Sequence, residues 1–481
     1  MKALEELRQV RLAKAEKFRK MGIDPYPSQA CRTHTAGEIA SDFTKLEGQP
    51  ATVAGRIMSQ RGYGKIAFWD LVDESGKIQL YLKEGDLNPT TMAHLDLFDI
   101  GDFVQASGAV TKTQTGEISI LVKDLHILTK SIRPLPEKWA GLKDPELRLR
   151  KRYLDLIVNP EAKELFRLKA KWFHAMRTFL EDHGFLEVHT PSLQTLSGGA
   201  DARPFVTHMN ALDIDLYLRI APELYLKRLI VGGYEKVYEV GRNFRNEGID
   251  AEHLQDYEAC EFYWAYADFE DLKKFLVEWY RYMVKETIGS YQHQHQGQLI
   301  DWSREWEELD YLETVKKLAG VDLRQEDSVA DLRQVLEAKK ISYEKEAGWG
   351  RLADLVWKKI CRPQIIQPAF LVNHPVEISP LSKRNPADPK KVLRLNIVAG
   401  GWELANAFCE LNDPLDQYER FAAQEKLKAA GDEEAQNMDL DFVEALEYGM
   451  PPTVGLGLSE RLFSFFVDKP LRETTLFPLM R

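Results

Sequence analysis

Three short segments carry polar side chains of the kind that bind charged ligands. The first is Phe244-Arg245-Asn246-Glu247, which follows the strand-like run EKVYEVG. A guanidinium at the end of a strand is well placed to hold a phosphate or a carboxylate through its planar fork. Because most arginines merely cover surface, this segment alone indicates a ligand only weakly.

The second segment is GGWELANAFCE, residues 400–410. If it forms a strand, the period of two places Asn406, Phe408 and Glu410 on one face. Polar groups among Ala, Leu and Cys are costly to bury unpaired, so we expect them to line a polar pocket. The third segment is GLGLSER, residues 455–461, whose glycines would let a ligand approach the backbone and whose arginine could meet a phosphate. A simple turn is the alternative for this third segment.

The composition is that of an ordinary globular chain. Its 481 residues are 44% hydrophobic and 29% charged, which excludes a disordered or fibrous chain and indicates about two to four domains. We find no run of about 18 apolar residues, so no membrane-spanning helix is expected. The cysteines (Cys31, Cys260, Cys361, Cys409) form no CxxC pair, which disfavours a disulfide framework or a structural zinc site and favours a reducing, cytoplasmic location.

The net charge of −11 argues against a general affinity for nucleic acid, because the polyanionic backbone dominates such binding. A local basic stripe remains compatible with an acidic protein. The densest stripe is RLRKR, residues 148–152, for which a solvated linker is the more common explanation. Charge alone therefore leaves nucleic-acid binding open.

The elements that would position these segments indicate an α+β protein. Residues 1–45 predict an N-terminal helical segment that breaks at GIDPYP. Residues 46–130 hold five short β-rich runs separated by turn signals, which suits a five-stranded OB-type barrel that commonly binds oligonucleotides, although another small barrel fits equally well. Residues 131–155 predict a linker rich in proline. Residues 156–481 alternate helical and strand patterns, with a helical insertion expected at 290–360.

Taken together, the pieces resemble the class II aminoacyl-tRNA synthetases, and within them the lysyl-tRNA synthetase family. The resemblance covers nearly the whole chain and is carried by GIDPYP, LRLRKRYLDL, LEVHTPSL, SGGADARPF, LYLRIAPELYLKRLIVGGYEKVYEVGRNFRNEGID, CEFYWAYAD, PVEISPL, GGWELANAFCELNDP, LEYGMPP and LFPLMR. It implies a C-terminal antiparallel sheet flanked by helices. It also implies ATP-dependent ligation of L-lysine to lysine tRNA through a lysyl-adenylate, with release of AMP and pyrophosphate. Such a reaction needs positioning and charge neutralisation and no protein nucleophile.

The resemblance implies an ATP site and a metal site. Arg245 and Arg461 match the catalytic arginines, the first bridging the lysine carboxylate and the α-phosphate. The ATP-binding set that the resemblance implies is Arg245, Glu247, His253, Tyr257, Glu403 and Arg461. Mg²⁺ is the implied cofactor, because it prefers oxygen ligands and lets phosphates complete its shell. Its candidate ligands are Glu403, Glu410 and Asn396.

A pocket for lysine must compensate a buried ammonium with carboxylates and neutral donors. The resemblance implies that seven residues do so: Gly199, Glu223, Glu261, Tyr263, Asn406, Phe408 and Glu410. Glu261, Tyr263 and Glu410 would meet the side-chain ammonium, and Glu223 with the Gly199 backbone would hold the α-amino group. A surface position is the alternative for Glu261 and Glu410, although both lie in aromatic or apolar runs.

Four barrel residues resemble anticodon contacts: Arg61, Phe68, Gln79 and Glu117. Unpaired bases stack on aromatic rings and are read on their edges, which suits Phe68 and Gln79. A core position is the alternative for Phe68. Pro191 matches the first class II motif, which builds a dimer interface, so we expect a homodimer whose partners are ATP, L-lysine and lysine tRNA, with no membrane.

Three features depart from the family pattern. Asn396 stands where the family usually has a Mg²⁺-binding Glu, which puts the metal affinity and the number of metal ions in doubt. Glu252, beside His253, lies in the phosphate-facing loop, where a carboxylate would repel ATP unless it turns away. The segment GLGLSER is one residue shorter than the usual motif, which ends in Asp-Arg, so the adenine floor is expected to differ.

Two rival functions remain at this point. An aspartyl- or asparaginyl-tRNA synthetase would share both domains, but its pocket would need extra Lys or Arg for a side-chain carboxylate. A non-catalytic RNA-binding paralogue is motivated by the three departures. ATP–pyrophosphate exchange with each amino acid would separate all three functions.

Overall fold

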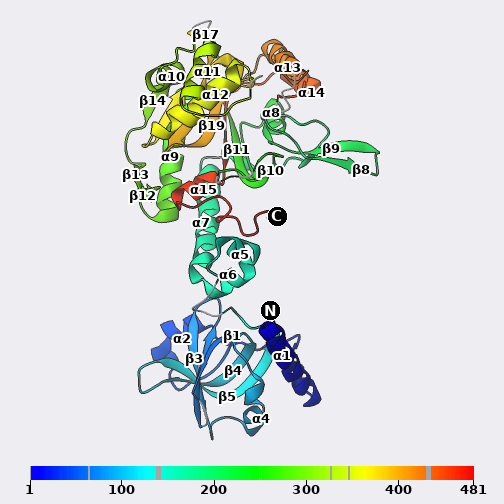
Figure 1. Ribbon diagram of the computed structural model, residues 1–481, viewed down its shortest axis with the longest axis vertical. Helices are drawn as coiled ribbons and strands as arrows, with labels where there is room; N and C mark the ends of the chain where they lie inside the picture. The colour runs from blue at the N-terminus through cyan, green and yellow to red at the C-terminus, as the bar shows by residue number, and fades with distance from the viewer. Residues whose placement is uncertain are drawn as a thin grey trace. The chain divides into compact units, whose positions relative to one another are not determined.

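The computed structural model describes residues 2–62, 65–136, 142–248, 250, 252–324, 328–344, 347–429 and 435–480. By contact the chain divides into two compact units, Met1–Asp144 and Pro145–Arg481 (Figure 1). Each unit has a hydrophobic core of its own. Over the ranges just given, every helix is too short or too polar to cross a membrane.

The first unit is built around a closed barrel of five strands in the order β1-β2-β3-β5-β4. Strands β3 and β5 pair in parallel and the other neighbours pair antiparallel. Its helices are α1 (Lys2–Lys20), α2 (Ala36–Ser41), α3 (Phe43–Leu46) and α4 (Pro89–Met92), and its strands are β1 (Pro50–Arg61), β2 (Ile66–Val72), β3 (Lys77–Lys83), β4 (Phe103–Lys112) and β5 (Ile118–Thr129). The predicted five-stranded barrel is confirmed.

The second unit is organised by an eight-stranded sheet in the order β14-β15-β18-β19-β20-β11-β10-β6. The six strands from β15 to β10 are antiparallel, as predicted, but β14 on β15 and β6 on β10 are parallel, so the sheet is mixed. The strands are β14 (Glu307–Asp310), β15 (Ala369–Val372), β18 (Arg394–Ala399), β19 (Trp402–Cys409), β20 (Thr453–Ser459), β11 (Asp256–Ala265), β10 (Lys236–Phe244) and β6 (Leu186–Glu187).

The two faces of this sheet carry different layers, because side chains alternate along each strand. Phe262 of β11 faces a large aromatic core that includes Trp172 of α7 and Trp279 of α9. Tyr263, the next residue, belongs to a cluster on the other face together with Phe421 and residues of α8 and α14. The helices are α5 (Pro145–Arg150), α6 (Arg152–Val158), α7 (Pro160–Asp182), α8 (Glu223–Val231), α9 (Phe269–Ile288), α10 (Tyr311–Ala319), α11 (Ser328–Ala338), α12 (Trp349–Val356), α13 (Pro414–Ala429), α14 (Leu440–Glu447) and α15 (Arg461–Phe466).

Three predicted segments differ from the structure. The interval 290–360 is only partly helical, because strands come first and helices α10, α11 and α12 follow. The interval 131–155 includes α5 and the start of α6, while residues 137–141 lie outside the described residues. The segment GLGLSER is no turn, since β20 runs directly into α15. The remaining short strands are β7 (Leu193–Gln194), β8 (Val206–Met209), β9 (Ile214–Leu218), β12 (Gln292–His295), β13 (Gln298–Asp301), β16 (Arg384–Asn385) and β17 (Asp388–Val392).

Candidate active site

One pocket lies on the face of the eight-stranded sheet that α8 covers, and most of the predicted site residues line it. Its lining includes Gly199, Glu223, Arg245, Tyr257, Glu261, Tyr263, Glu403, Asn406, Phe408, Glu410 and Arg461. Of the predicted residues in this unit, Glu247, His253 and Asn396 lie outside that lining. Asn396 nevertheless touches the pocket wall, because its Nδ2 donates to Glu403 Oε1 at 2.9 Å.

The glycines of β20 make room for the side chains of its two neighbouring strands. Gly455 is opposite Tyr263 of β11 and also opposite Phe408 of β19. A Cβ at Gly455 would lie 2.3 Å from Glu410 Oε1 and 2.6 Å from the Tyr263 ring, closer than real Cβ atoms come. At Gly457 the nearest atom, Glu261 Cγ, would be 3.6 Å away, which is ordinary contact. Only glycine therefore fits at position 455.

Strand β19 places two polar side chains in the pocket through an irregularity. Glu403 and Asn406 are three residues apart, and a regular strand would point them to opposite faces. The pairing of β18 with β19 shifts between Ile397 and Val398, which is a β-bulge. An extra residue on one strand re-aims the neighbouring side chains, so Glu403 joins Asn406 on the pocket face.

A buried ammonium holds two of the pocket carboxylates. Lys227 is fully buried on α8, with its Nζ 2.6 Å from Glu223 Oε1 and in an ion pair with Glu410 Oε2. Burial lowers the pKa of Lys227, but the two carboxylates outweigh it and the pKa is raised above its ordinary value. Burial raises the pKa of both Glu223 and Glu410, and Lys227 opposes that rise.

The third carboxylate of the pocket, Glu261, is bonded differently. It is 8% exposed, and its Oε2 accepts a hydrogen bond from Tyr263 Oη at 3.3 Å. Burial, and after it the charge of Glu223, raise the pKa of Glu261 to about 8, although Arg245 opposes the change. A positive charge placed beside Glu261 would favour its ionised form, so this wall of the pocket is suited to an ammonium.

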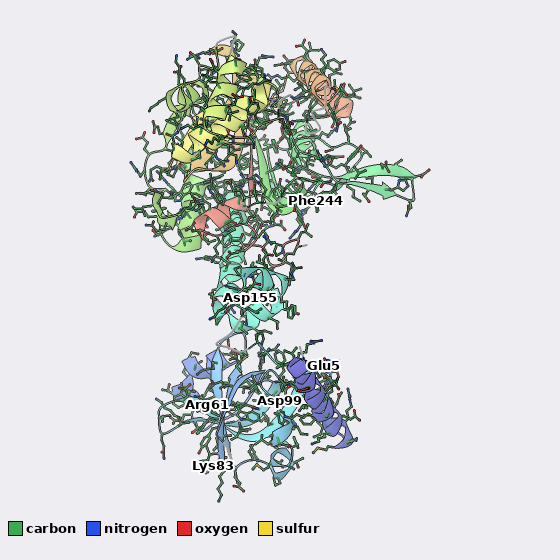
Figure 2. The ribbon with its side chains drawn as sticks, in the orientation of Figure 1. Glu5, Arg61, Lys83, Asp99, Asp155 and Phe244 are labelled. Carbon is green, nitrogen blue, oxygen red and sulfur yellow. The ribbon has the colours of Figure 1, made fainter. Side chains whose placement is uncertain are left out.

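Two guanidiniums line the same pocket. Arg245 comes directly after Phe244, the last residue of β10, which Figure 2 labels, and its Cζ lies 5.6 Å from the centre of the Tyr257 ring. Arg461 begins α15 and donates Nη1 to the Glu403 carbonyl at 3.2 Å. The Nε of each arginine is buried and has no hydrogen-bond partner among the described residues. Donors left free in this way suit an anion with several oxygens.

The predicted metal ligands do not form one group. Glu410 is engaged by Lys227, whereas Asn396 and Glu403 are in contact. Across the described ranges, three or more His, Cys, Asp or Glu side chains nowhere converge as a metal site. Mg²⁺ commonly takes one or two carboxylates and fills its shell with water and phosphate oxygens. Glu403 therefore fits a Mg²⁺ ion that also binds phosphates, whereas Asn396 turns its amide nitrogen toward Glu403 and would have to rotate to offer its oxygen.

On the barrel, the aromatic residue predicted to meet a base lies on the outside. Trp69 points into the core, while Phe68 is half-buried on the outer side of β2. The Phe68 ring stacks on Tyr81 of β3, with centroids 5.0 Å apart and planes 18° from parallel. Tyr81 was not among the predicted residues. It follows Gln79 by two residues in a strand, and this spacing places both side chains on the same face.

The other predicted barrel residues belong to the same neighbourhood. Arg61 pairs in register with Phe68 and forms an ion pair with Asp70 at 3.0 Å. Gln79 is buried, and its Oε1 accepts from Ser119 Oγ at 3.0 Å, so its amide nitrogen remains available. Glu117 directly precedes β5 and forms an ion pair with Lys77, two residues before Gln79.

Two further residues were missed in the second unit, one buried behind the pocket wall and one in its lining. Lys227 follows Glu223 by four residues in a helix, a spacing that indicates an ion pair but is usually found on a solvated face. Arg394 lines the pocket and donates Nε to Asn406 Oδ1 at 2.8 Å, which fixes that amide. Its sequence context carries no comparable signal.

Comparison with known proteins finds two family matches, one for each of the two compact units. The family described as tRNA synthetases class II (D, K and N) matches residues 144–481, and an OB-fold nucleic acid binding domain matches residues 51–128. The lysine–tRNA ligase of Pelotomaculum thermopropionicum is 47% identical over 99% of this chain and 95% of its own length. Those of Roseiflexus castenholzii and Carboxydothermus hydrogenoformans are 48% and 46% identical over 99% of this chain and 99% and 98% of their own.

The chain therefore belongs to the class II tRNA synthetases. Within that class it belongs to the lysine–tRNA ligase family, whose members match it nearly from end to end. The resemblance inferred from the sequence and the predicted α+β fold are confirmed.

The Glu261 carboxyl should make stability depend on pH. With a folded pKa of about 8 against an ordinary 4.5, the folded protein keeps this proton where the unfolded chain has lost it. Stability should thus fall by up to about 1.4 kcal/mol per pH unit between these values. Glu261→Gln should remove this slope in urea unfolding at pH 5.5, 6.5 and 7.5, whereas the exposed control Glu444→Gln should keep it. Equal slopes in wild type and Glu261→Gln would contradict the assignment.

Proposed function

We propose that the protein ligates L-lysine to lysine tRNA, first forming lysyl-adenylate from lysine and ATP and then passing the lysyl group to the tRNA. The observation that carries this proposal is one pocket with opposite charge at its two sides. The buried carboxyls of Glu223, Glu261 and Glu410 line it together with the guanidiniums of Arg245 and Arg461.

The carboxyl side receives the amino acid. The side-chain ammonium of lysine lies beside Glu261, Tyr263 and Glu410, where it replaces lost hydration with charged hydrogen bonds. Glu223 and the backbone at Gly199 hold the α-amino group. Lysine is then anchored at both nitrogens, and its carboxylate is left to face the guanidiniums.

The guanidinium side receives ATP and supplies the catalysis. Arg245 bridges the lysine carboxylate and the α-phosphate, Tyr257 stacks on adenine, and Arg461 holds the far phosphates. Glu247 and His253 add contacts from the loop after β10. In-line attack then requires only that the reactants are aligned and that positive groups neutralise the negative charge developing on the phosphate oxygens. One preorganised donor of this kind is typically worth about 3–4 kcal/mol in the transition state.

The metal is Mg²⁺, which would be held by Glu403, by Asn396 if its amide rotates to offer the oxygen, and by the phosphates. When bound, it neutralises phosphate charge and fixes the geometry of the triphosphate. Because Asn396 offers no charge, we infer that the protein contributes one anionic ligand here. Arg461, which donates to the Glu403 carbonyl, keeps this carboxylate-bearing strand aligned with the phosphate site.

The barrel reads the anticodon. Phe68 and Tyr81 offer a stacked aromatic platform, and the free amide nitrogen of Gln79 can meet a base edge. Arg61 and Glu117 border this platform from β1 and the start of β5. The enzyme acts as a homodimer in the cytoplasm; the free cysteines suit a reducing compartment, and the exposed Leu193 and Val206 near the Pro191 segment suit an interface.

The rival functions fit this site less well. A pocket for aspartate or asparagine has no use for three carboxyls. Lys227 is already shared by Glu223 and Glu410, and Arg394 is bonded to Asn406 and to the Ile378 carbonyl. A non-catalytic paralogue has no reason to keep both the carboxyl cluster and two arginines with free donors in one pocket.

Amino-acid-dependent ATP–pyrophosphate exchange tests the proposal. Lysine should support exchange and the other amino acids should not. Gly455→Ala should lower kcat/KM for lysine by about 10- to 100-fold or more, because the new Cβ displaces the Glu410 carboxylate and the Tyr263 ring, both of which would bond the lysine ammonium. Gly457→Ala, where the Cβ has ordinary contacts, should cost much less. Exchange with aspartate, or none with lysine, would contradict the proposal.

Changing the barrel should separate tRNA recognition from adenylate formation. Phe68→Ala should weaken lysine tRNA charging by about 1–3 kcal/mol, the value of one stacked base, while exchange stays unchanged. Phe68→Tyr, which keeps the ring, is the matched control. Equal loss of charging and exchange in Phe68→Ala would instead indicate a folding defect and remove the anticodon role.

A further inference from the structure

Glu252 presents an electrostatic problem beside the proposed nucleotide site, because its loop joins two strands of the pocket although neither Glu252 nor Arg362 belongs to the lining itself. It lies in the loop between β10 and β11, between the pocket residues Arg245 and Tyr257. An uncompensated carboxylate in this loop would repel a polyphosphate held by Arg245 and Arg461, and Coulomb repulsion acts over several ångströms inside a protein. Some cation is needed here if ATP is to bind.

The structure provides that cation from a distant part of the sequence. Arg362 Nη2 lies 3.4 Å from Glu252 Oε1, and the two side chains are 14% and 21% exposed. Arg362 Nε and Glu252 Oε2 are both buried and have no hydrogen-bond partner within the described part of the chain. Counting only partners in the described ranges, this one long ion pair leaves most of the five donors of the guanidinium unused.

The backbone fixes Arg362 against the strands that carry the proposed metal ligands. Arg362 follows a π-helical turn, Trp357–Cys361, a feature often found at functional sites. The next residues bond to the β18–β19 hairpin, since Gly401 N donates to Ile365 O at 2.9 Å and Gly400 N to Ile366 O at 2.8 Å. Glu403 lies two residues beyond this hairpin turn, on β19.

A second cation on the same segment is bonded differently, since Lys358 Nζ forms an ion pair with Asp354 at 2.8 Å. Lys358 is four residues before Arg362, one helical turn away. Burial lowers the pKa of Lys358, but Asp354 and then Glu403 raise it above its ordinary value. The segment before β15 therefore carries a second positive charge, which Asp354 compensates.

Arg362 shares one property with the two arginines of the pocket. In each of Arg245, Arg362 and Arg461 the Nε is buried without a partner in the described residues, as it also is in Arg228 and Arg472 elsewhere in the second unit. A largely buried guanidinium is stable only when anions compensate it, and a single contact at 3.4 Å compensates it poorly. Such a group is preorganised for a further anion.

We propose that Arg362 is a third guanidinium of the nucleotide site, held in place by Glu252 and presenting its remaining N–H groups to the polyphosphate of ATP. This inference rests on the proposed function and extends it to a residue that lies outside the loop between β10 and β11 and that the family resemblance did not indicate. Glu252 then positions the arginine instead of repelling ATP.

Kinetics of lysine-dependent ATP–pyrophosphate exchange by the full chain test this inference. Arg362→Gln should raise KM for ATP by about tenfold, as expected for loss of one charged contact, and leave KM for lysine unchanged. Lys359→Gln, an exposed lysine on the same turn, is the matched control and should change neither value. An unchanged KM for ATP in Arg362→Gln, or an equal rise for lysine, would overturn the proposal.

A charge reversal tests the pair as a unit. Glu252→Arg combined with Arg362→Glu keeps one guanidinium and one carboxylate in contact and should recover most of the ATP affinity lost in Arg362→Gln. A double variant as weak as Arg362→Gln would overturn the role of Glu252. If Arg362→Gln fails to fold by circular dichroism, Arg362→Lys replaces it, with a smaller rise in KM for ATP expected and no rise contradicting the proposal. Absence of exchange in the wild type would instead refute the proposed function.

Discussion

The buried ammonium of Lys227 is the constraint on which the rest of the site depends. Three carboxyls in one protein wall would repel one another and lose their hydration, and a low-dielectric interior magnifies both penalties. Lys227 bonds Glu223 and Glu410 at once, so the cluster folds with most of its charge balanced. Glu261, whose pKa is raised to about 8, keeps its proton near neutral pH and can release it when a further ammonium binds beside it. Helix α8 therefore acts as both a packing element and the counter-charge of the pocket.

The sheet turns this local balance into a site with two chemically distinct sides. Strands β10, β11, β19 and β20 are neighbours in space although they span more than 200 residues of sequence. Their pocket face holds carboxyls at one side and guanidiniums at the other, while the opposite face packs on the aromatic core beneath α7 and α9. The glycines of β20 keep the middle open. A rigid, well-packed sheet thus holds two charge patterns at fixed separation, which is what joining a carboxylate to a phosphate requires.

Strand periodicity explains what the sequence could predict. Asn406, Phe408 and Glu410 were expected on one face because side chains alternate, and all three line the pocket. Glu403 has the wrong parity and reaches that face only through the bulge in β18–β19, so only family resemblance indicated it. The five-stranded barrel was predictable from its short β-rich runs and the turn signals between them, although burial along β3 and β5 does not alternate strictly.

Other features could not be inferred because they depend on contacts between remote segments. Lys227 has the spacing of a surface ion pair, and only its full burial reveals its role. Glu252 and Arg362 are 110 residues apart, so neither position indicates the other. The interval 290–360 mixes strands and helices because β12 and β13 pair with each other and β14 adds to the edge of the large sheet, which local helical periodicity does not reveal.

The central claim is that this pocket recognises an amino acid by the ammonium at the end of its side chain. Isothermal titration of the full chain with L-lysine and with L-norleucine, which has the same carbon chain without the nitrogen, measures that contribution directly. Sites built around a buried polar partner reject the analogue lacking it by large factors, so lysine should bind at least about 1,000-fold more tightly than norleucine. Equal affinity for the two amino acids would contradict the account.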